Sequence, residues 1–328
     1  MRRYYIEQKL KSAAAFLIIL ILLPYIVSVF VSGTGVRADR KEEETYVQVK
    51  TEDARGEIQT EELGWTEYLV GILAEDLPRD TEHEAVKAQA VLVRTSLYQT
   101  LSKEDKTLES DYLTRGEMQE KWGLSDYQEI YDSYVQAVEE TDNLVLWYGD
   151  GYPWVPFHQS SNGMTRSAEE VTGSKDYPYI AAKECPLDKE AEDEIQVFSF
   201  GYSEIQEKCR DFLVAAEGED EARQGYSFED FEIQSRDSSG YVQKLRIGKT
   251  VCTGDQFRDA LSLPSSDFSF SEGGNKMKIT TSGKGHGLGM SLWTANEMAK
   301  EGKTCEEILN FFFEGTSLKN DVQESDLI

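Results

Sequence analysis

Two helical segments joined by a short turn, within residues 65–98, constrain the fold of this chain more than any other feature. Apolar side chains recur at helical spacing in the first segment, at Tyr68, Leu69, Ile72 and Leu73, which predicts an amphipathic helix. Pro78 prevents that helix from continuing. Thr81 then stands where an N-cap is expected, with Glu84 three residues later as in a capping box. The second helix is predicted to present one face of mostly small residues, formed by Ala85, Ala88, Gln89, Leu92, Val93 and Ser96.

The end of the first helix carries two adjacent carboxylates, Glu75 and Asp76. Carboxylates at a helix end are candidates for acid–base chemistry. Successive residues of a helix point about 100° apart, so the two side chains are not expected to share one task. The alternative is structural: Asp76 ends the helix, or pairs with Lys87 or Arg94 on the second helix.

The rest of the chain mixes helices with short strands. Helical periodicity recurs over 127–140, and further helices are expected near 203–214, 254–261, 289–300 and 304–313. Strands are expected at 144–148, 198–202, 228–233, 241–247 and 276–281. The turn Gly149-Asp150-Gly151 predicts a hairpin whose second strand is 153–160, with His158 at its end. Together these elements predict an α+β fold, in one main domain with a subdomain or insertion.

The N-terminal region has its own organisation. Residues 13–31 contain no charge over 19 residues, enough for about 28 Å of helix, and predict a transmembrane anchor. Basic residues within 1–12 favour a cytoplasmic N-terminus, so the protein is expected to cross the cell membrane once and to hold its folded domain on the extracytoplasmic side. A cleaved signal peptide is the alternative. Residues 32–62 turn polar and predict a linker. The folded domain is then expected over 63–316, and a polar tail over 317–328.

Charge and cysteine content exclude several classes of function. The formal net charge of −27 argues against nucleic acid as a partner, because its phosphates would be repelled. The four cysteines, Cys185, Cys209, Cys252 and Cys305, form no CxxC pair, so neither a zinc knuckle nor a redox motif is predicted. Two disulfides and four free thiols are both compatible with the sequence. No GxSxG element supports a serine hydrolase.

Three ordered blocks carry a resemblance to a known family. The first is YLVGILAEDLP at 68–78 with EAVKAQAVLVRT at 84–95; the second is FHQSSNGMT at 157–165 with EEV at 169–171 and YPYI at 177–180; the third is GHGLGMS at 285–291 with GKT at 302–304 and IL at 308–309. These blocks resemble the signature elements of the SpoIID/LytB family, in the same order.

That resemblance implies a lytic transglycosylase that acts on peptidoglycan glycan strands, as part of engulfment in sporulating bacteria. One carboxylic acid would protonate the glycosidic oxygen, and its conjugate base would help the muramoyl 6-hydroxyl attack the anomeric carbon, giving a 1,6-anhydro sugar. Such an acid needs a raised pKa, from burial or from a second negative charge. The implied partners are glycan strands, the membrane through the N-terminal helix, and other cell-wall hydrolases.

The chain departs from the family at the residue that matters most. The family's catalytic Glu aligns with Asp76, while Glu75 takes a position usually filled by a small residue. Three interpretations stay open: Asp76 is the acid, Glu75 takes over through a small shift of the turn, or the site binds glycan without cleaving it. Lys284 and Leu292 stand where the family has Trp and Gln, and these changes also argue against assuming full activity.

Polar residues of all three blocks complete the predicted site. They are expected to contact the sugar or to shape the site around the acid: Arg94, His158, Ser160, Ser161, Thr165 and His286. For His286, hydrogen bonding to the backbone of a packed turn is the alternative. The glycines of 283–289 predict a tight turn, and the helix expected from Met290 would direct its N-terminal amides toward the cleft.

No cofactor is expected. Some family members bind zinc through the histidine equivalent to His158 and two cysteines six and twelve residues later. Those positions are Met164 and Glu170 here, and a thioether is a poor zinc ligand. Cys185 would serve as a ligand only if the fold returned it to His158. Trp147, Trp154 and Trp293 are candidates for stacking on sugar faces, with Trp154 preferred because it lies near His158 in the sequence.

Overall fold

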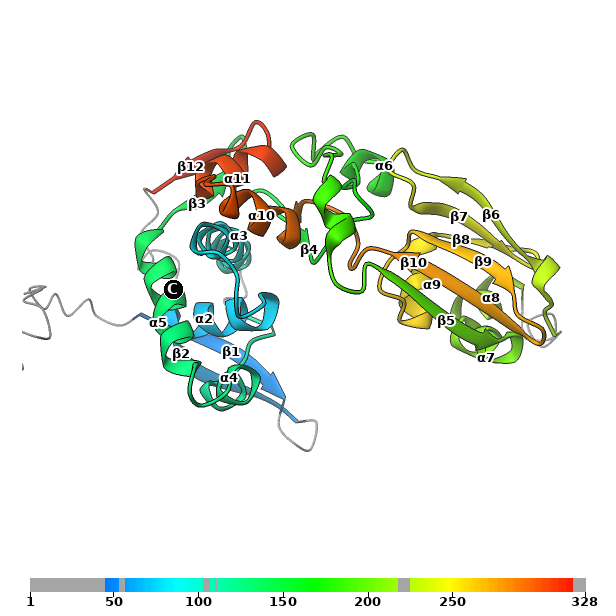
Figure 1. Ribbon diagram of the computed structural model, residues 1–328, viewed down its shortest axis with the longest axis horizontal. Coiled ribbons are helices and arrows are strands. Elements are labelled where there is room, and N and C mark those ends of the chain that lie inside the picture. The colour runs from blue at the N-terminus through cyan, green and yellow to red at the C-terminus, as the bar shows by residue number, and fades with distance from the viewer. Residues whose placement is uncertain (1–44, 53–56, 103–106, 110, 218–224, 321–328) are drawn as a thin grey trace, which may run out of the picture. The chain divides into compact units, whose positions relative to one another are not determined.

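The computed structural model describes residues 45–52, 57–102, 107–109, 111–217 and 225–320. Helix α3 (His83–Leu101) lies at the centre of the first of two hydrophobic cores. Its neighbours are α2 (Trp65–Asp76), α5 (Tyr127–Glu140), α10 (Leu292–Lys300) and α11 (Cys305–Phe312), as Figure 1 shows. Buried residues occur on every side of α3, whereas Ser96 is exposed. The predicted single packing face that included Ser96 is therefore wrong, and the small residues instead let several helices approach.

The start of α3 is held by long-range contacts rather than by the predicted capping box. The N-cap is Glu82, whose backbone N–H donates to Asn296 Oδ1 on α10 at 2.8 Å. The hydroxyl of Thr81 donates to the carbonyl of Pro78. Glu84 accepts a 2.6 Å bond from the backbone N–H of Cys305 at the start of α11, where the positive end of a helix favours a carboxylate. The predicted box between Thr81 and Glu84 does not form.

A two-stranded ribbon precedes α2. Strand β1 (Tyr46–Glu52) pairs antiparallel with β2 (Ile58–Gly64), which leads directly into α2. Val47 and Val49 are buried in the first core. The linker predicted over 32–62 is thus wrong for these two strands, because alternate valines on one strand face are enough to attach a polar segment to a core.

Short strands join distant parts of the chain. Strand β3 (Val145–Trp147) pairs antiparallel with β12 (Ser317–Lys319), and β4 (Phe157–His158) pairs in parallel with β11 (Met290–Ser291). The turn at Gly149 forms, closed by a bridge between Tyr148 and Gly151, but the predicted hairpin partner 153–160 does not pair with β3. The polar tail predicted over 317–328 begins instead as a strand.

The second core lies in an insertion between two segments of the first. Two three-stranded antiparallel sheets and three helices enclose it. The strand order is β5 (Ile195–Gly201), β10 (Lys276–Ser282) and β9 (Phe268–Glu272) in one sheet, and β6 (Phe231–Arg236), β7 (Val242–Ile247) and β8 (Thr250–Cys252) in the other. The helices are α7 (Tyr202–Lys208), α8 (Arg210–Glu217) and α9 (Gly254–Leu261). The helix predicted over 203–214 is two helices, and the one predicted from 289 begins at Leu292 because the preceding residues form β11. Shorter helices are α4 (Arg115–Trp122) and α6 (Ala168–Thr172).

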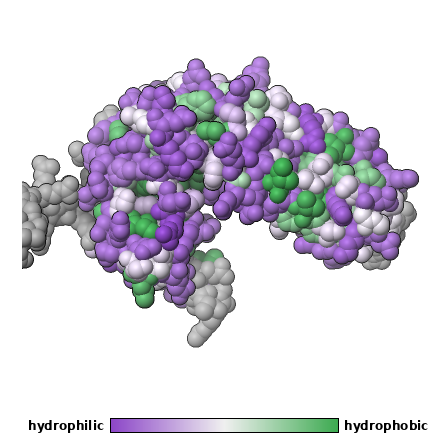
Figure 2. Space-filling model, viewed as in Figure 1, coloured by the Kyte–Doolittle hydropathy of each residue, from purple (hydrophilic) through white to green (hydrophobic). Residues whose placement is uncertain are grey.

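The mixture of helices and antiparallel sheets fits the α+β prediction. Among the described residues, no helix is both long and apolar enough to cross a membrane; residues 1–12 and the anchor predicted over 13–31 lie outside them. All four cysteines are buried and free. The visible face of the molecule is mostly hydrophilic (Figure 2), in keeping with the high net negative charge.

Candidate functional site

Asp76 is the last residue of α2, and its side chain is partly buried. One carboxylate oxygen, Oδ2, accepts a 2.9 Å hydrogen bond from Nε2 of Gln89 on α3. The backbone carbonyl of Asp76 accepts a 2.8 Å bond from Nε2 of Gln159, the residue after β4. Lys121 of α4 donates to the carbonyls of Ala74 and Glu75. The free carbonyls at the end of α2 thus have side-chain partners, which hold the acid in place.

The surroundings of Asp76 favour its protonated form. Burial raises the pKa of the carboxyl from its ordinary value of 3.8 to about 6, against the lowering effect of the hydrogen bond from Gln89. The negative charge of Glu75 raises this pKa further, and the positive charge of Lys121 lowers it. A carboxylic acid with a pKa near 6 can donate a proton in weakly acidic to neutral solution.

Glu75 has a different environment from its neighbour. Its side chain is exposed, so solvent stabilises its charge. The two acids point to different surroundings, as expected for successive helical residues. Glu75 therefore contributes its charge to the field at Asp76 and lacks the buried setting that a proton donor needs.

The three sequence blocks meet at this site. Gln159 of the second block binds Asp76 of the first, and the carbonyl of Gln159 accepts a 3.0 Å bond from the backbone N–H of Trp293, two residues beyond the third block. The parallel pairing of β4 with β11 places the second and third blocks side by side. Segments more than 200 residues apart in the sequence thus converge within one hydrogen-bonded cluster.

The two histidines of these blocks lie together. The ring centroids of His158 and His286 are 5.9 Å apart. His158 Nδ1 donates to the carbonyl of Leu288, and His286 Nδ1 accepts from the N–H of Leu288. Within the described residues, neither imidazole forms a hydrogen bond to Glu75 or Asp76. Burial lowers the pKa of both histidines from 6.5 to about 4, so both are neutral at pH 7.

The hydroxyl residues of the second block are enclosed in the fold. Ser160, Ser161 and Thr165 are buried. Thr165 Oγ1 accepts from the N–H of Lys183, and Ser161 Oγ accepts from the N–H of Gly163. These residues were predicted either to contact the sugar or to shape the site. The hydrogen bonds of Ser161 and Thr165 to the backbone match the second role.

A buried carboxylate anchors that loop to α10. Asp188, within a short 3₁₀ helix, Pro186–Glu190, accepts bonds from the N–H of Ser161 and from the hydroxyls of Ser291 and Thr294. Burial raises its pKa. Two hydroxyls at the N-terminus of α10 therefore bind Asp188, whereas the amide of Trp293 donates to the carbonyl of Gln159.

Arg94 is a core residue. Its side chain is 1% exposed, and its guanidinium donates to the carbonyls of Val138 and Leu144 and to the hydroxyl of Thr141. A guanidinium enclosed in this way holds α3 to the end of α5. These contacts are those of a structural residue, and the predicted contact between Arg94 and a substrate stays a prediction.

Three residues around the acid were not assigned to the site from the sequence: Gln89, Lys121 and Gln159. A signal existed for Gln89 in the sequence, since a glutamine on a helix face of alanines and other apolar residues needs a polar partner once that face is packed. Lys121 and Gln159 carried no such signal, because both come from separate segments whose packing was unknown. Among the described residues, no group of three or more His, Cys, Asp or Glu side chains could hold a metal ion.

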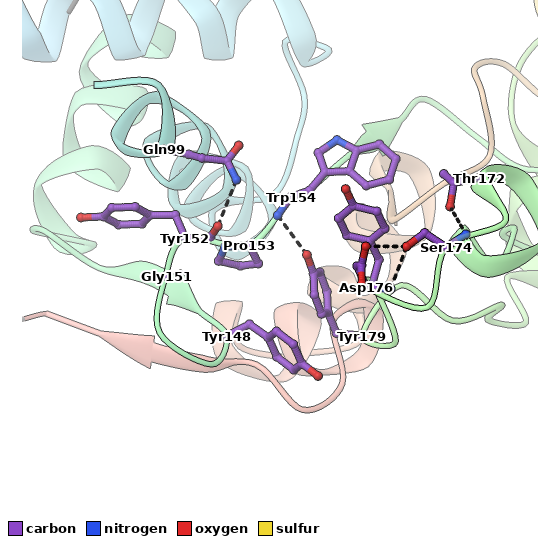
Figure 3. Close-up of a pocket in the computed structure, with 11 residues that line it drawn as sticks. Gln99, Tyr148, Gly151, Tyr152, Pro153, Trp154, Thr172, Ser174, Asp176 and Tyr179 are labelled. Atoms are coloured by element: carbon purple, nitrogen blue, oxygen red, sulfur yellow. Dashed lines mark hydrogen bonds between the residues drawn. The ribbon is translucent and has the colours of Figure 1, made fainter. Parts of the chain in front are cut away.

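The predicted sugar-stacking tryptophans lie at different places. Trp154 packs against Tyr177 and lines a cavity (Figure 3), whereas Trp147 contacts Tyr152 and the Lys319 ammonium. Trp293 is on α10, with its indole N–H buried. Only Trp154 of the three lines that cavity.

Comparison with known proteins finds one matching family and several similar proteins. The family described as SpoIID, Stage II sporulation protein, matches residues 53–148. Stage II sporulation protein D of Bacillus subtilis (strain 168) is 28% identical over 270 residues, covering 79% of this chain and 75% of the relative. The protein of the same name from Bacillus amyloliquefaciens is 29% identical over 278 residues, covering 81% and 76%. An uncharacterized protein of Brachyspira hyodysenteriae is 28% identical over 262 residues, covering 78% and 67%.

Proposed function

Because these matches support assigning the chain to the SpoIID family, which is linked to sporulation, we propose that it is a lytic transglycosylase that cleaves peptidoglycan glycan strands. The observation that carries this proposal is the partly buried carboxyl of Asp76, whose pKa is raised to about 6 at the point where the three sequence blocks meet. The reaction needs a single carboxylic acid whose pKa is raised.

Asp76 would act twice. As an acid it donates its proton to the glycosidic oxygen while the bond to the anomeric carbon breaks. As a carboxylate it then accepts the proton of the muramoyl 6-hydroxyl, whose oxygen closes the 1,6-anhydro ring. The amide of Gln89 can serve both states: Nε2 donates to the carboxylate, and a flipped amide would accept from the acid through Oε1, which has no partner among the described residues.

The proposed setting is the outer side of a membrane. Residues 13–31 are uncharged and would anchor the chain, with the folded body extracytoplasmic. Glycan strands would be its substrate, and other cell-wall hydrolases would be its partners during engulfment or wall remodelling.

One observation favours a second candidate function, a glycan-binding scaffold without cleavage. The aspartate side chain is one methylene shorter than the glutamate that the family resemblance places there, and its carboxylate is already bound by Gln89. Such a protein would bind wall glycan and recruit other hydrolases without turning the glycan over.

Purified full-length protein in detergent, incubated with peptide-free glycan strands, separates these candidates. We expect anhydro-muramoyl products by mass spectrometry, and a rate that falls about tenfold per pH unit above pH 6 as Asp76 loses its proton. Asp76→Asn is expected to lower the rate by at least ~100-fold, whereas Glu75→Gln, at the exposed neighbour, should change it only a few-fold. Co-sedimentation with glycan but no products would instead support the scaffold, and loss of activity in Glu75→Gln alone would transfer the acid role to Glu75.

A further inference from the structure

A cavity of about 590 Å³ opens beside the C-terminal half of α3, separate from the carboxylates. Two segments supply most of its lining: residues 148–154 after β3, and residues 172–179 after α6. Figure 3 shows aromatic side chains from both segments around the space, with Gln99 of α3 at one side. Neither Asp76 nor the two buried histidines line it.

The aromatic rings of this cavity are held by one another. Trp154 and Tyr177 meet edge to face, with ring centroids 5.1 Å apart at 68°. Tyr148 and Tyr179 are tilted by 49° at 4.6 Å. The hydroxyl of the buried Tyr179 accepts a 3.0 Å bond from the backbone N–H of Trp154, so this bond joins the two segments. Ring faces that are already fixed lose little entropy when a ligand stacks on them.

The polar groups of the cavity suit a ligand with several hydroxyls. Among the described residues, no group forms a hydrogen bond with the hydroxyl of Tyr148 or of Tyr177, and each can donate as well as accept. Asp176 and Ser174 lie at the rim, joined by a 2.6 Å hydrogen bond. No lysine or arginine lines the cavity, so an anionic ligand has no charge partner there.

The cavity and the acid lie at different positions along α3. Gln89, which binds Asp76, and Gln99, which lines the cavity, are ten residues apart on one helix, about 15 Å at 1.5 Å per residue. A ligand at the cavity therefore does not reach Asp76 unless it is several sugar units long.

We propose that this cavity is a second carbohydrate site, which binds an uncharged hexopyranose unit of a glycan without cleaving it. Trp154 and Tyr177 offer apolar faces for the C–H groups of a pyranose ring, and the tyrosine hydroxyls, Ser174 and Asp176 bind its hydroxyls. Acidic sugars are excluded because Asp176 would repel them. This site goes beyond the cleavage proposed for Asp76 and does not depend on it.

Binding of chitotetraose, a neutral tetramer of N-acetylglucosamine with no muramoyl unit, tests the proposal on the full-length protein by calorimetry and tryptophan fluorescence. We expect saturable binding that Tyr177→Ala weakens at least ~10-fold, while Tyr177→Phe, which keeps the ring, weakens it less. Tyr46→Ala, at an exposed tyrosine outside the cavity, is the matched control and should bind like the wild type. If Tyr177→Ala does not fold by circular dichroism, Asp176→Ala at the exposed rim takes its place.

Three outcomes would overturn the proposal. These are no binding at millimolar chitotetraose, binding unaffected by the cavity variants, and tighter binding of the cationic glucosamine tetramer, which would make the cavity an ammonium site instead. Asp76→Asn separates this inference from the proposed cleavage, since that variant should still bind chitotetraose. Binding lost in Asp76→Asn but kept in Tyr177→Ala would place the sugar at the acid and not at the cavity.

Discussion

At Asp76, burial and hydrogen bonding have opposite effects on the pKa of the carboxyl. Burial raises the pKa, while the bond from Gln89 lowers it, and the carboxyl keeps a pKa of about 6. The folded protein therefore binds this proton more tightly than the unfolded chain, whose aspartate titrates near 3.8. Between these two pKa values the free energy of unfolding falls as the pH rises, and above pH 6 the ionised side chain lowers stability by a constant amount. Such a loss of stability at a functional residue is common.

Asp76→Asn should consequently stabilise the protein in a pH-dependent way. Below pH 4 we expect no difference from the wild type, and above pH 6 a gain on the order of 1–3 kcal/mol in the free energy of unfolding. Urea unfolding at pH 4 and pH 8 measures it. Glu75→Gln, at an exposed site, serves as the control and should stay within about 0.5 kcal/mol. A gain of equal size at both pH values would contradict the assigned cause.

At the scale of the elements, a close approach of two backbones assembles the site. Strands β4 and β11 pair over two residues each, and the N–H of Met290 donates to the carbonyl of Pro156. Gly289 precedes Met290 with φ of +71°, and a β-carbon on it would overlap the carbonyl oxygen of Pro156. Glycine is required there by both the backbone conformation and the space.

Two glycine substitutions separate these requirements. Gly289→Ala should lower the free energy of unfolding by more than about 3 kcal/mol, because it combines the strained conformation with a backbone clash. Gly302→Ala is the matched control: its φ is +86° but an added β-carbon meets nothing within 4 Å, so only the conformational cost of about 1 kcal/mol is expected. Urea denaturation measures both, and equal losses would show that the approach of β4 to β11 is not tight.

At the scale of the whole described molecule, a buried ion cluster connects the two cores. Arg166 follows β4, and its side chain is 2% exposed. Nε pairs with Asp237 at 2.7 Å and Nη1 with Asp255 at 3.0 Å, both beside the second core, and the guanidinium lies over the ring of Tyr241. Removing one member of such a cluster leaves uncompensated charge in the interior.

Arg166→Met should therefore destabilise the protein by about 3–5 kcal/mol and weaken the coupling between the cores. The five tryptophans, at 65, 122, 147, 154 and 293, all lie outside the second core, so their fluorescence reports on the rest of the protein. In Arg166→Met we expect the circular dichroism signal of the strands to be lost at a lower urea concentration than the change in fluorescence. In the wild type we expect both transitions at the same urea concentration. Arg246→Met, at a surface pair with Glu232, is the control and should lower the free energy of unfolding by no more than about 1 kcal/mol. Coincident transitions in Arg166→Met would argue against a role of Arg166 in coupling the two cores.

Local signals in the sequence placed many of the elements but not their partners. The helices over 65–76 and 127–140 and the strands near 242–247 and 276–282 follow from periodicity and from breakers such as Pro78, because these effects act between residues a few positions apart. The candidate acid at the end of a helix was visible for the same reason. The partner of β3 was predicted wrongly, since a turn sequence at Gly149 indicates a hairpin but does not exclude pairing with a strand 170 residues later.

The sequence by itself determined the class of fold, the three blocks and the acidic pair before Pro78. Only the tertiary structure decided which acid is buried, that Gln89 binds it, that Arg94 belongs to the core, and that Trp154 faces a cavity with Tyr177. The physical reason is that burial and hydrogen-bond partners depend on contacts between residues far apart in the chain. Those contacts are set by the packing of whole elements, which no local pattern of residues records.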